Sequence, residues 1–342
     1  YDVDITLGED RVASYFGMRK FSLVEQQGRQ VLALKNEPYF QTGLLDQGYW
    51  SDGLYTPPSD EAMVCDIRTM KELGFNMLRK HAKIEPERFY YHCDQLGMLV
   101  WQDMVNGGSA YKHWFVTYLA TLMNWNHISF SDDEKHAGLL SRLNPEGKDE
   151  FRREITETIA FLYNHPSIVV WVPFNEGWGQ FDALAACEQI RTLDSSRLVD
   201  HASGWFDQKG GDILSLHYYF LKLKFKPESK RAAALTEFGG YSLSIPGHSC
   251  CKKVYGYKKF NSTGALTYGY IDLIRQTILP AVKKGIGATV YTQLSDIEEE
   301  TNGIYTYDRE ICKIDPDTLR KWNRALKEAG ECKTYADHPT DH

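Results

Sequence analysis

Two stretches of this chain decide its fold: Val169-Val170-Trp171-Val172-Pro173-Phe174-Asn175-Glu176 and Ala234-Leu235-Thr236-Glu237-Phe238-Gly239. Each is an apolar run of strand length that ends on a glutamate, with glycine a few residues further on. A carboxylate has no packing role at the tip of a buried strand. In a barrel of parallel strands, however, the C-terminal tips carry the active site. Two such glutamates favour paired-carboxylate chemistry, of which glycoside hydrolysis is the commonest form.

Around these stretches, strand-like and helix-like segments alternate from about residue 39. The segments with strand character are 39–45, 75–79, 98–103, 167–175, 198–202, 213–217, 232–237 and 288–294. Helical periodicity covers 59–73, 85–96, 150–163, 182–193, 268–284 and 317–329, with Ser59 as a predicted N-cap. Apolar strands that alternate with helices predict a parallel sheet covered on both faces. The number of units predicts an α/β fold, a closed (β/α)₈ TIM barrel.

The first thirty residues differ from the rest. Residues 1–7 alternate in the manner of a strand, 8–10 form a turn, and 11–23 read as another extended stretch. We therefore expect 1–30 to be the end of a β-sandwich domain with its linker, and 31–342 to be the barrel. The chain opens on Tyr1, so we also expect a fragment of a longer protein.

Composition limits the partners. A net charge of −7 argues against nucleic acid, since phosphate binding requires a basic surface. No apolar stretch approaches the length of a membrane span, so a membrane is not expected either. The seven cysteines are an odd number without metal-ligand spacing. We expect free thiols and a cytoplasmic location. Whether the chain forms a homo-oligomer is left open.

Several motifs together resemble glycoside hydrolase family 2, the β-galactosidase, β-glucuronidase and β-mannosidase group. His165-Pro166-Ser167 leads into the first glutamate-bearing strand. Residues 66–81 are similar to the family's first barrel helix and second strand, and 90–100 to its next helix and third strand. The resemblance follows the family order from about residue 35 to 310. The opening residues resemble the tail of the immunoglobulin-like domain that precedes the barrel in that family.

The resemblance implies a β-galactosidase-like, retaining exo-glycosidase that removes terminal β-linked sugars by double displacement with two glutamates. Glu176 matches the general acid/base and Glu237 the nucleophile. Asn175 matches the residue that binds the sugar 2-hydroxyl. Tyr219 matches the tyrosine that hydrogen-bonds the nucleophile, with Tyr218 as an adjacent alternative.

Further substrate-binding residues are expected at the strand ends. Arg79 and His81 match the family's pair after the second strand. Asp46 and Asp103 stand where contacts with the substrate are expected. Trp178 and Trp205 follow the fourth and fifth strands, where sugar stacking competes with ordinary packing. The long stretch 104–149 is expected to form part of the substrate-binding wall.

The sequence departs from the family's β-galactosidases in places that bear on specificity. Trp101-Gln102-Asp103-Met104 lacks the acidic and histidine-rich continuation that binds magnesium in those enzymes. We therefore expect no metal and no cofactor. Alternatives are a retaining α-L-arabinofuranosidase or a β-glucuronidase on the same scaffold, and a catalytically silent carbohydrate-binding fragment. A metal-dependent hydrolase is disfavoured, because no His-x-His or His-Glu-x-x-His pair is present.

Overall fold

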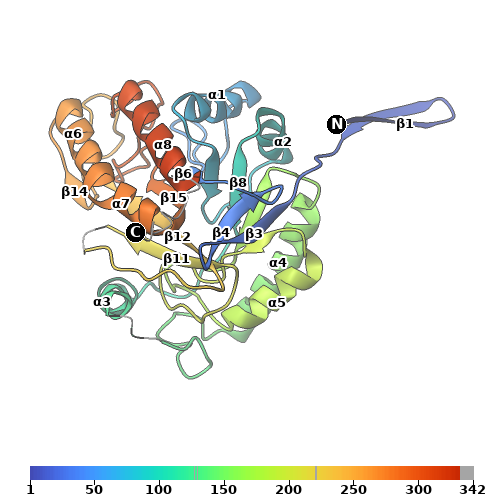
Figure 1. Ribbon diagram of the computed structural model, residues 1–342, viewed down its shortest axis with the longest axis horizontal. Coiled ribbons are helices and arrows are strands. Elements are labelled where there is room, and N and C mark those ends of the chain that lie inside the picture. The colour runs from blue at the N-terminus through green and yellow to red at the C-terminus, as the bar shows by residue number, and fades with distance from the viewer. Residues whose placement is uncertain (127, 129, 220–221, 332–342) are drawn as a thin grey trace, which may run out of the picture.

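Eight parallel strands surround a common interior in the computed structural model, which describes residues 1–126, 128, 130–219 and 222–331 (Figure 1). In chain order the strands are β6 (Gln41–Asp46), β7 (Met77–Lys80), β8 (Leu99–Asp103), β9 (Ile168–Val172), β10 (Leu198–Val199), β11 (Ile213–Tyr218), β12 (Ala232–Gly239) and β15 (Ile286–Thr292). Each overlaps one of the segments that the sequence predicted, with ends that differ by up to a few residues.

The barrel is nearly closed, whereas the sequence predicted a closed one. Hydrogen bonding runs from β10 through β9, β8, β7, β6, β15 and β12 to β11. Among the described residues, β10 and β11 do not pair as strands. Instead, the carboxylate of Asp212 accepts the Val199 N–H at 2.8 Å. The Asp212 side chain thus accepts the Val199 N–H, which would otherwise donate to a carbonyl of a neighbouring strand. Strand β10 ends at Val199, after two residues.

The helices surround the strands, as Figure 1 shows. They are α1 (Asp60–Glu72), α2 (Glu87–Leu96), α4 (Pro145–Leu162), α5 (Ala183–Leu193), α6 (Thr263–Leu273), the π-helix η2 (Ile274–Ile278), α7 (Leu279–Lys284) and α8 (Pro316–Glu331). The predicted cap is confirmed, since Ser59 Oγ accepts the Ala62 N–H at 3.2 Å. Two helices begin five residues earlier than predicted, because Asn144 and Ser262 cap them.

Smaller elements complete the connections. The π-helix η1 (Trp114–Leu119) and α3 (Ala120–Trp125) lie in the long β8–α4 connection, and the short strands are β5 (Glu37–Pro38), β13 (Tyr241–Ser242) and β14 (Lys258–Lys259). None of the helices described is long and apolar enough to cross a membrane. All six cysteines in the described part of the chain are free thiols, as expected, and Cys332 lies outside it.

Two of the three apolar clusters among the described residues form the core of the barrel. One fills the barrel interior with inward side chains such as Leu45, Met77, Trp101 and Val172. The other lies between strands and helices and takes the alternate residues, such as Leu44. Because successive strand residues point to opposite faces, this division fixes which side chains reach the interior and its open end.

The N-terminal residues form two hairpins with different surroundings. Strands β1 (Asp2–Leu7) and β2 (Asp10–Tyr15) pair with each other and stand off from the barrel (Figure 1). Strands β3 (Phe21–Gln26) and β4 (Arg29–Leu34) pair with each other, and β4 joins β12. Phe21 and Leu32 belong to the interior cluster. The predicted boundary after residue 30 therefore falls inside a hairpin that shares the barrel's sheet.

Candidate active site

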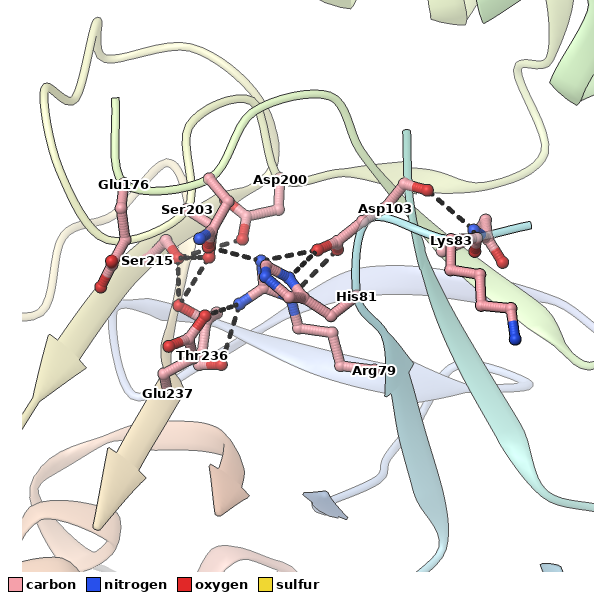
Figure 2. A network of polar contacts seen from close by, with 12 residues as sticks. Arg79, His81, Lys83, Asp103, Glu176, Asp200, Ser203, Ser215, Thr236 and Glu237 are labelled. Atoms are coloured by element: carbon pink, nitrogen blue, oxygen red, sulfur yellow. Dashed lines mark hydrogen bonds and ion pairs between the residues drawn. The ribbon is translucent and has the colours of Figure 1, made fainter. Parts of the chain in front are cut away.

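Glu237 reaches the barrel interior because β12 contains an irregularity. Ala232 and Ala234 face inward and Leu235 faces outward. Strict alternation would then bring Thr236 in and send Glu237 out. The pairing of β11 with β12 shifts here: Leu216 pairs with Leu235, but His217 pairs with Glu237. A β-bulge of this kind re-aims side chains. Both Thr236 and Glu237 therefore take part in the interior polar network, shown in Figure 2.

Arg79 is the centre of that network. Its guanidinium forms a two-pronged pair with Asp103, at 3.0 Å for each bond. It also donates to Glu237 Oε1 at 3.1 Å and to Asn175 Oδ1 at 2.8 Å. Burial alone would lower the pKa of Arg79, but Asp103 and Glu237 raise it. Arg79 therefore remains a cation that holds residues from two other strands and one loop in fixed positions.

His81 and Asp103 extend the network towards the open end of the barrel. His81 Nδ1 lies 2.7 Å from Asp103 Oδ2. Burial raises the pKa of Asp103, but Arg79 and His81 more than offset this and hold it below the usual value. Asp103 is almost fully buried; it fixes Arg79 and His81, and it lines a pocket together with His81 and Asn175.

Tyr219 holds the second oxygen of Glu237. Its hydroxyl donates to Glu237 Oε2 and lies 3.0 Å from Thr292 Oγ1. Burial, with the Glu237 charge, raises the pKa of Tyr219 well above its usual value, so it stays a donor. Tyr218 packs against the cluster between strands and helices. It therefore faces away from Glu237, and the structure favours Tyr219 of the two.

Glu176 lies in the loop after β9, in a left-handed conformation with φ of +50°. The adjacent Gly177 has φ of +72°, and a Cβ there would meet the Phe206 ring at 2.2 Å, so only glycine fits. The Glu176 N–H donates to Ser203 O at 2.8 Å. Its carboxyl side chain retains 23% exposure. Burial nevertheless raises the pKa of Glu176 to about 7.

His217 connects the two glutamates. Its Nδ1 lies 2.8 Å from Glu176 Oε1 and 3.6 Å from Glu237 Oε2. Its Nε2 lies 3.0 Å from Ser203 Oγ, which belongs to a buried cluster of hydroxyls. Burial lowers the pKa of His217 to about 4, so the ring is uncharged near neutral pH.

The carboxyl groups of Glu176 and Glu237 are close together. One oxygen from each, with a nitrogen of His217, all lie within 4.8 Å of one another. These three side chains are also close enough together to hold one metal ion. The same is true of a second group, His248, Asp308 and Glu310. The site therefore places Glu176, whose raised pKa keeps much of it protonated near pH 7, beside Glu237, which accepts hydrogen bonds from Arg79 and Tyr219.

The two tryptophans line different pockets, and both pack against one apolar cluster. Trp178 lines a pocket together with His81 and Asn175. Trp205 lines another together with His217 and Tyr219. The long β8–α4 connection packs against Trp205 through Phe115 and Leu140 among others. The structure thus brings the predicted wall to this face of the barrel.

Asp46 is not with the other predicted residues, and this corrects its predicted place. It lies at the end of β6 on the outward face, where Oδ2 accepts from Lys80 Nζ at 2.8 Å. Lys80 also pairs with Glu85 at 2.6 Å. Because Leu45 points inward, alternation turns Asp46 towards the helices. It belongs to a buried ion-pair cluster behind the site.

Sequence reasoning missed two groups in this region as site residues. The first is His217, although alternation along Ser215, His217 and Tyr219 puts all three on one face. The second is Glu300 with Gln47 and Gln293, whose amides both donate to its carboxylate. A loop after the last strand brings Glu300 back to the barrel, and no local pattern marks it.

Comparisons with known proteins show the family and the relatives that this chain resembles. Residues 59–278 match the family described as "Glycosyl hydrolases family 2, TIM barrel domain". The β-galactosidase of Leuconostoc mesenteroides is 26% identical over 98% of this chain and 31% of its own length. The β-mannosidase B of Thermothelomyces thermophilus is 32% identical over 28% of this chain and 8% of its own. This chain thus spans less than a third of either relative.

Solved structures give the same fold. A β-glucuronidase from an uncultured Clostridium species superimposes with a TM-score of 0.68, at 14% identity, over 95% of this chain and 56% of that one. A family 2 β-galacturonidase from Eisenbergiella tayi has a TM-score of 0.64, at 18% identity, over 92% of this chain and 56% of its own.

Proposed function

The chain belongs to glycosyl hydrolase family 2, and from this premise we propose that it is a retaining exo-glycosidase acting on β-linked sugars. Glu237 is the nucleophile and Glu176 the general acid/base. The observation that carries the proposal is the approach of their carboxyl oxygens to within 4.8 Å. Retaining glycosidases hold these groups about 5–5.5 Å apart, whereas inverting enzymes leave about 6.5–9.5 Å for a water molecule.

In the first step, Glu237 attacks the anomeric carbon and the bond to the leaving oxygen breaks. Glu176 gives its proton to that oxygen, which leaves as an alcohol. The hydrogen bonds from Arg79 and Tyr219 hold the two carboxyl oxygens of Glu237 in place for this attack. A pKa of about 7 keeps much of Glu176 protonated near neutral pH.

In the second step, Glu176 takes a proton from water as the water oxygen attacks the anomeric carbon. The bond to Glu237 breaks, and the sugar leaves with its original configuration. His217 suits both steps without becoming charged. Its Nδ1 lies 2.8 Å from Glu176 Oε1, so the neutral ring orients that carboxyl group while the proton leaves for the glycosidic oxygen and is later replaced from water.

The remaining residues position the sugar. Asn175 accepts from Arg79 through Oδ1, which leaves its Nδ2 to donate to the 2-hydroxyl. His81 and Trp178 line the pocket beside Asn175, and Trp205 lines a second pocket together with His217 and Tyr219. Asp103 acts as a positioning residue through Arg79 and His81.

The first hairpin, formed by β1 and β2, bears on where the barrel domain begins. Strands β1 and β2 are exposed and stand apart from the barrel. We propose that they end an immunoglobulin-like sandwich domain, and that the barrel domain begins within residues 16–20.

The test is hydrolysis of aryl glycosides by the wild type, Glu237→Gln and the control Glu150→Gln, which changes an exposed residue of α4. The panel holds the β-galactoside, β-glucoside, β-mannoside, β-glucuronide and α-L-arabinofuranoside. We expect turnover of a β-glycoside that Glu237→Gln lowers by about 10⁴-fold or more, while Glu150→Gln keeps it. Sugar binding without turnover by the wild type would instead indicate a carbohydrate-binding fragment.

A further inference from the structure

A third carboxylate, that of Glu300, lies at the same end of the barrel. The segment after β15 folds back on itself: Gln293 N donates to Asn302 O at 3.1 Å, and Ile304 N donates to Gln293 O at 2.8 Å. This return brings Glu300 to the end of the strand. There its Oε2 accepts from Gln47 Nε2 at 3.1 Å and from Gln293 Nε2 at 2.9 Å.

The strand order places Glu300 near the nucleophile. Gln47 follows β6 and Gln293 follows β15, and these strands are neighbours. On the other side of β15 is β12, which carries Glu237, and on the other side of β6 is β7, which precedes His81. Glu300 therefore lies above the middle of four consecutive strands.

The charged residues of the site affect the pKa of Glu300. Burial raises its pKa above the usual value, His81 lowers it and Glu237 raises it. Among the described residues, the hydrogen bonds of its carboxylate come from neutral amides, and both reach Oε2. Oε1 thus remains available to accept from a ligand. The nearby cation Arg79 is already engaged by Asp103 and Glu237.

We propose that Glu300 determines the sugar accepted by this site, binding hydroxyl groups of a neutral glycone through its carboxylate and excluding uronic acids. The inference rests on the proposed function. A carboxylate only accepts hydrogen bonds, which suits sugar hydroxyls. A uronate would bring another anion to the end of the barrel that already holds Glu237 and Glu300, whose charges affect each other, and like charges at close range disfavour binding.

This assignment separates the chain from the uronidases that share its fold. Fold similarity alone does not transfer a substrate, because specificity is set by side chains at the site. The competing explanation is that Glu300 only ties β6 to β15. In that case its loss would affect every substrate equally.

The test uses aryl β-glycosides of neutral sugars, their 3-, 4- and 6-deoxy analogues, and the β-glucuronide and β-galacturonide. The variants are Glu300→Gln and the control Glu298→Gln, an exposed residue of the same loop. We expect the wild type to hydrolyse a neutral glycoside at least about 100-fold better than either uronide. Glu300→Gln should lose about 10- to 100-fold on the neutral parent and much less on one deoxy analogue, while Glu298→Gln matches the wild type.

Wild-type turnover of a uronide at a rate comparable to the neutral sugars would overturn the proposal. An equal loss of activity on all substrates in Glu300→Gln would also overturn it, because that result is expected if Glu300 only links β6 to β15. If the wild type hydrolyses nothing, the proposed function fails. Calorimetric titration with galactose, glucose, mannose and glucuronate then decides the inference: binding of a neutral sugar, but not of glucuronate, supports it, and binding of glucuronate or of none rejects it.

Discussion

Glu176 and Glu237 are the same residue type at similar strand ends, yet their surroundings differ. Glu237 accepts hydrogen bonds from Arg79 and Tyr219, one on each carboxyl oxygen. Glu176 contacts a neutral histidine, and burial raises its pKa to about 7. Environments that separate two carboxyl groups in this way assign one to proton donation and the other to nucleophilic attack.

The raised pKa of Glu176 gives a pH prediction. The first step needs its protonated form, which is lost as the pH rises through about 7. We therefore expect kcat/KM to fall on the alkaline side with an apparent pKa near that value. In Glu176→Ala this limb should disappear. Turnover of glycosides with poor leaving groups should fall by about 10²- to 10⁴-fold, and that of 2,4-dinitrophenyl glycosides far less. An alkaline limb that persists in the variant would contradict the role.

The sequence predicted most individual site residues because each ends an apolar strand or belongs to a motif. Arg79, Asp103, Asn175, Tyr219 and Glu237 indeed lie together. Their catalytic and binding roles stay predictions. The predicted place of Asp46 was wrong, because a position at the end of a strand does not determine whether the side chain points into the barrel or towards the helices. Glu300 was missed because its neighbours come from strands far away in the sequence.

At the scale of elements, irregular backbone positions both glutamates. The bulge in β12 turns Glu237 inward, and the left-handed turn at Glu176 and Gly177 follows β9. Periodicity identifies strands but cannot show a bulge, because one extra residue leaves no separate mark in the pattern. The same reasoning applies to the gap between β10 and β11, which depends on the side chain of Asp212.

The turn at Gly177 can be tested against a glycine in an open position. Gly177→Ala puts a Cβ against the Phe206 ring and strains a left-handed residue. It should cost about 1–3 kcal/mol of the free energy of unfolding and lower kcat/KM by shifting Glu176. Gly264→Ala, in α6, meets no atom within 4 Å and should be neutral or stabilising by up to about 1 kcal/mol. Urea denaturation and activity measurements check both, and equal behaviour of the two variants would refute the argument.

At the scale of the whole molecule, the two N-terminal hairpins differ in how they pack against the barrel. β3 and β4 contribute Phe21 and Leu32 to the interior cluster. The link before them is anchored: Tyr15 donates to Asp94 at 2.7 Å, and Arg19 donates to Pro166 O at 2.8 Å. The alternation of strand and helix was enough to predict the barrel, but not the second hairpin, because one expected extended stretch covered both β2 and β3.

Deletion of residues 1–14 removes β1 and most of β2 but keeps these anchors. We expect the Tm to change by only about 2 °C or less, because the lost contacts lie at the surface. Deletion of residues 1–34 removes Phe21 and Leu32 and should prevent cooperative unfolding. Thermal scans followed by circular dichroism compare the two. A large loss of Tm in the shorter deletion would place β1 and β2 in the barrel domain.

The most direct test of the paired-glutamate mechanism is the anomeric configuration of the first product. Proton NMR of an aryl β-glycoside during hydrolysis resolves the two anomers before they interconvert. Double displacement through Glu237 predicts that the β-anomer forms first and the α-anomer appears later by mutarotation. Initial release of the α-anomer would show inversion and would contradict the roles proposed for Glu176 and Glu237.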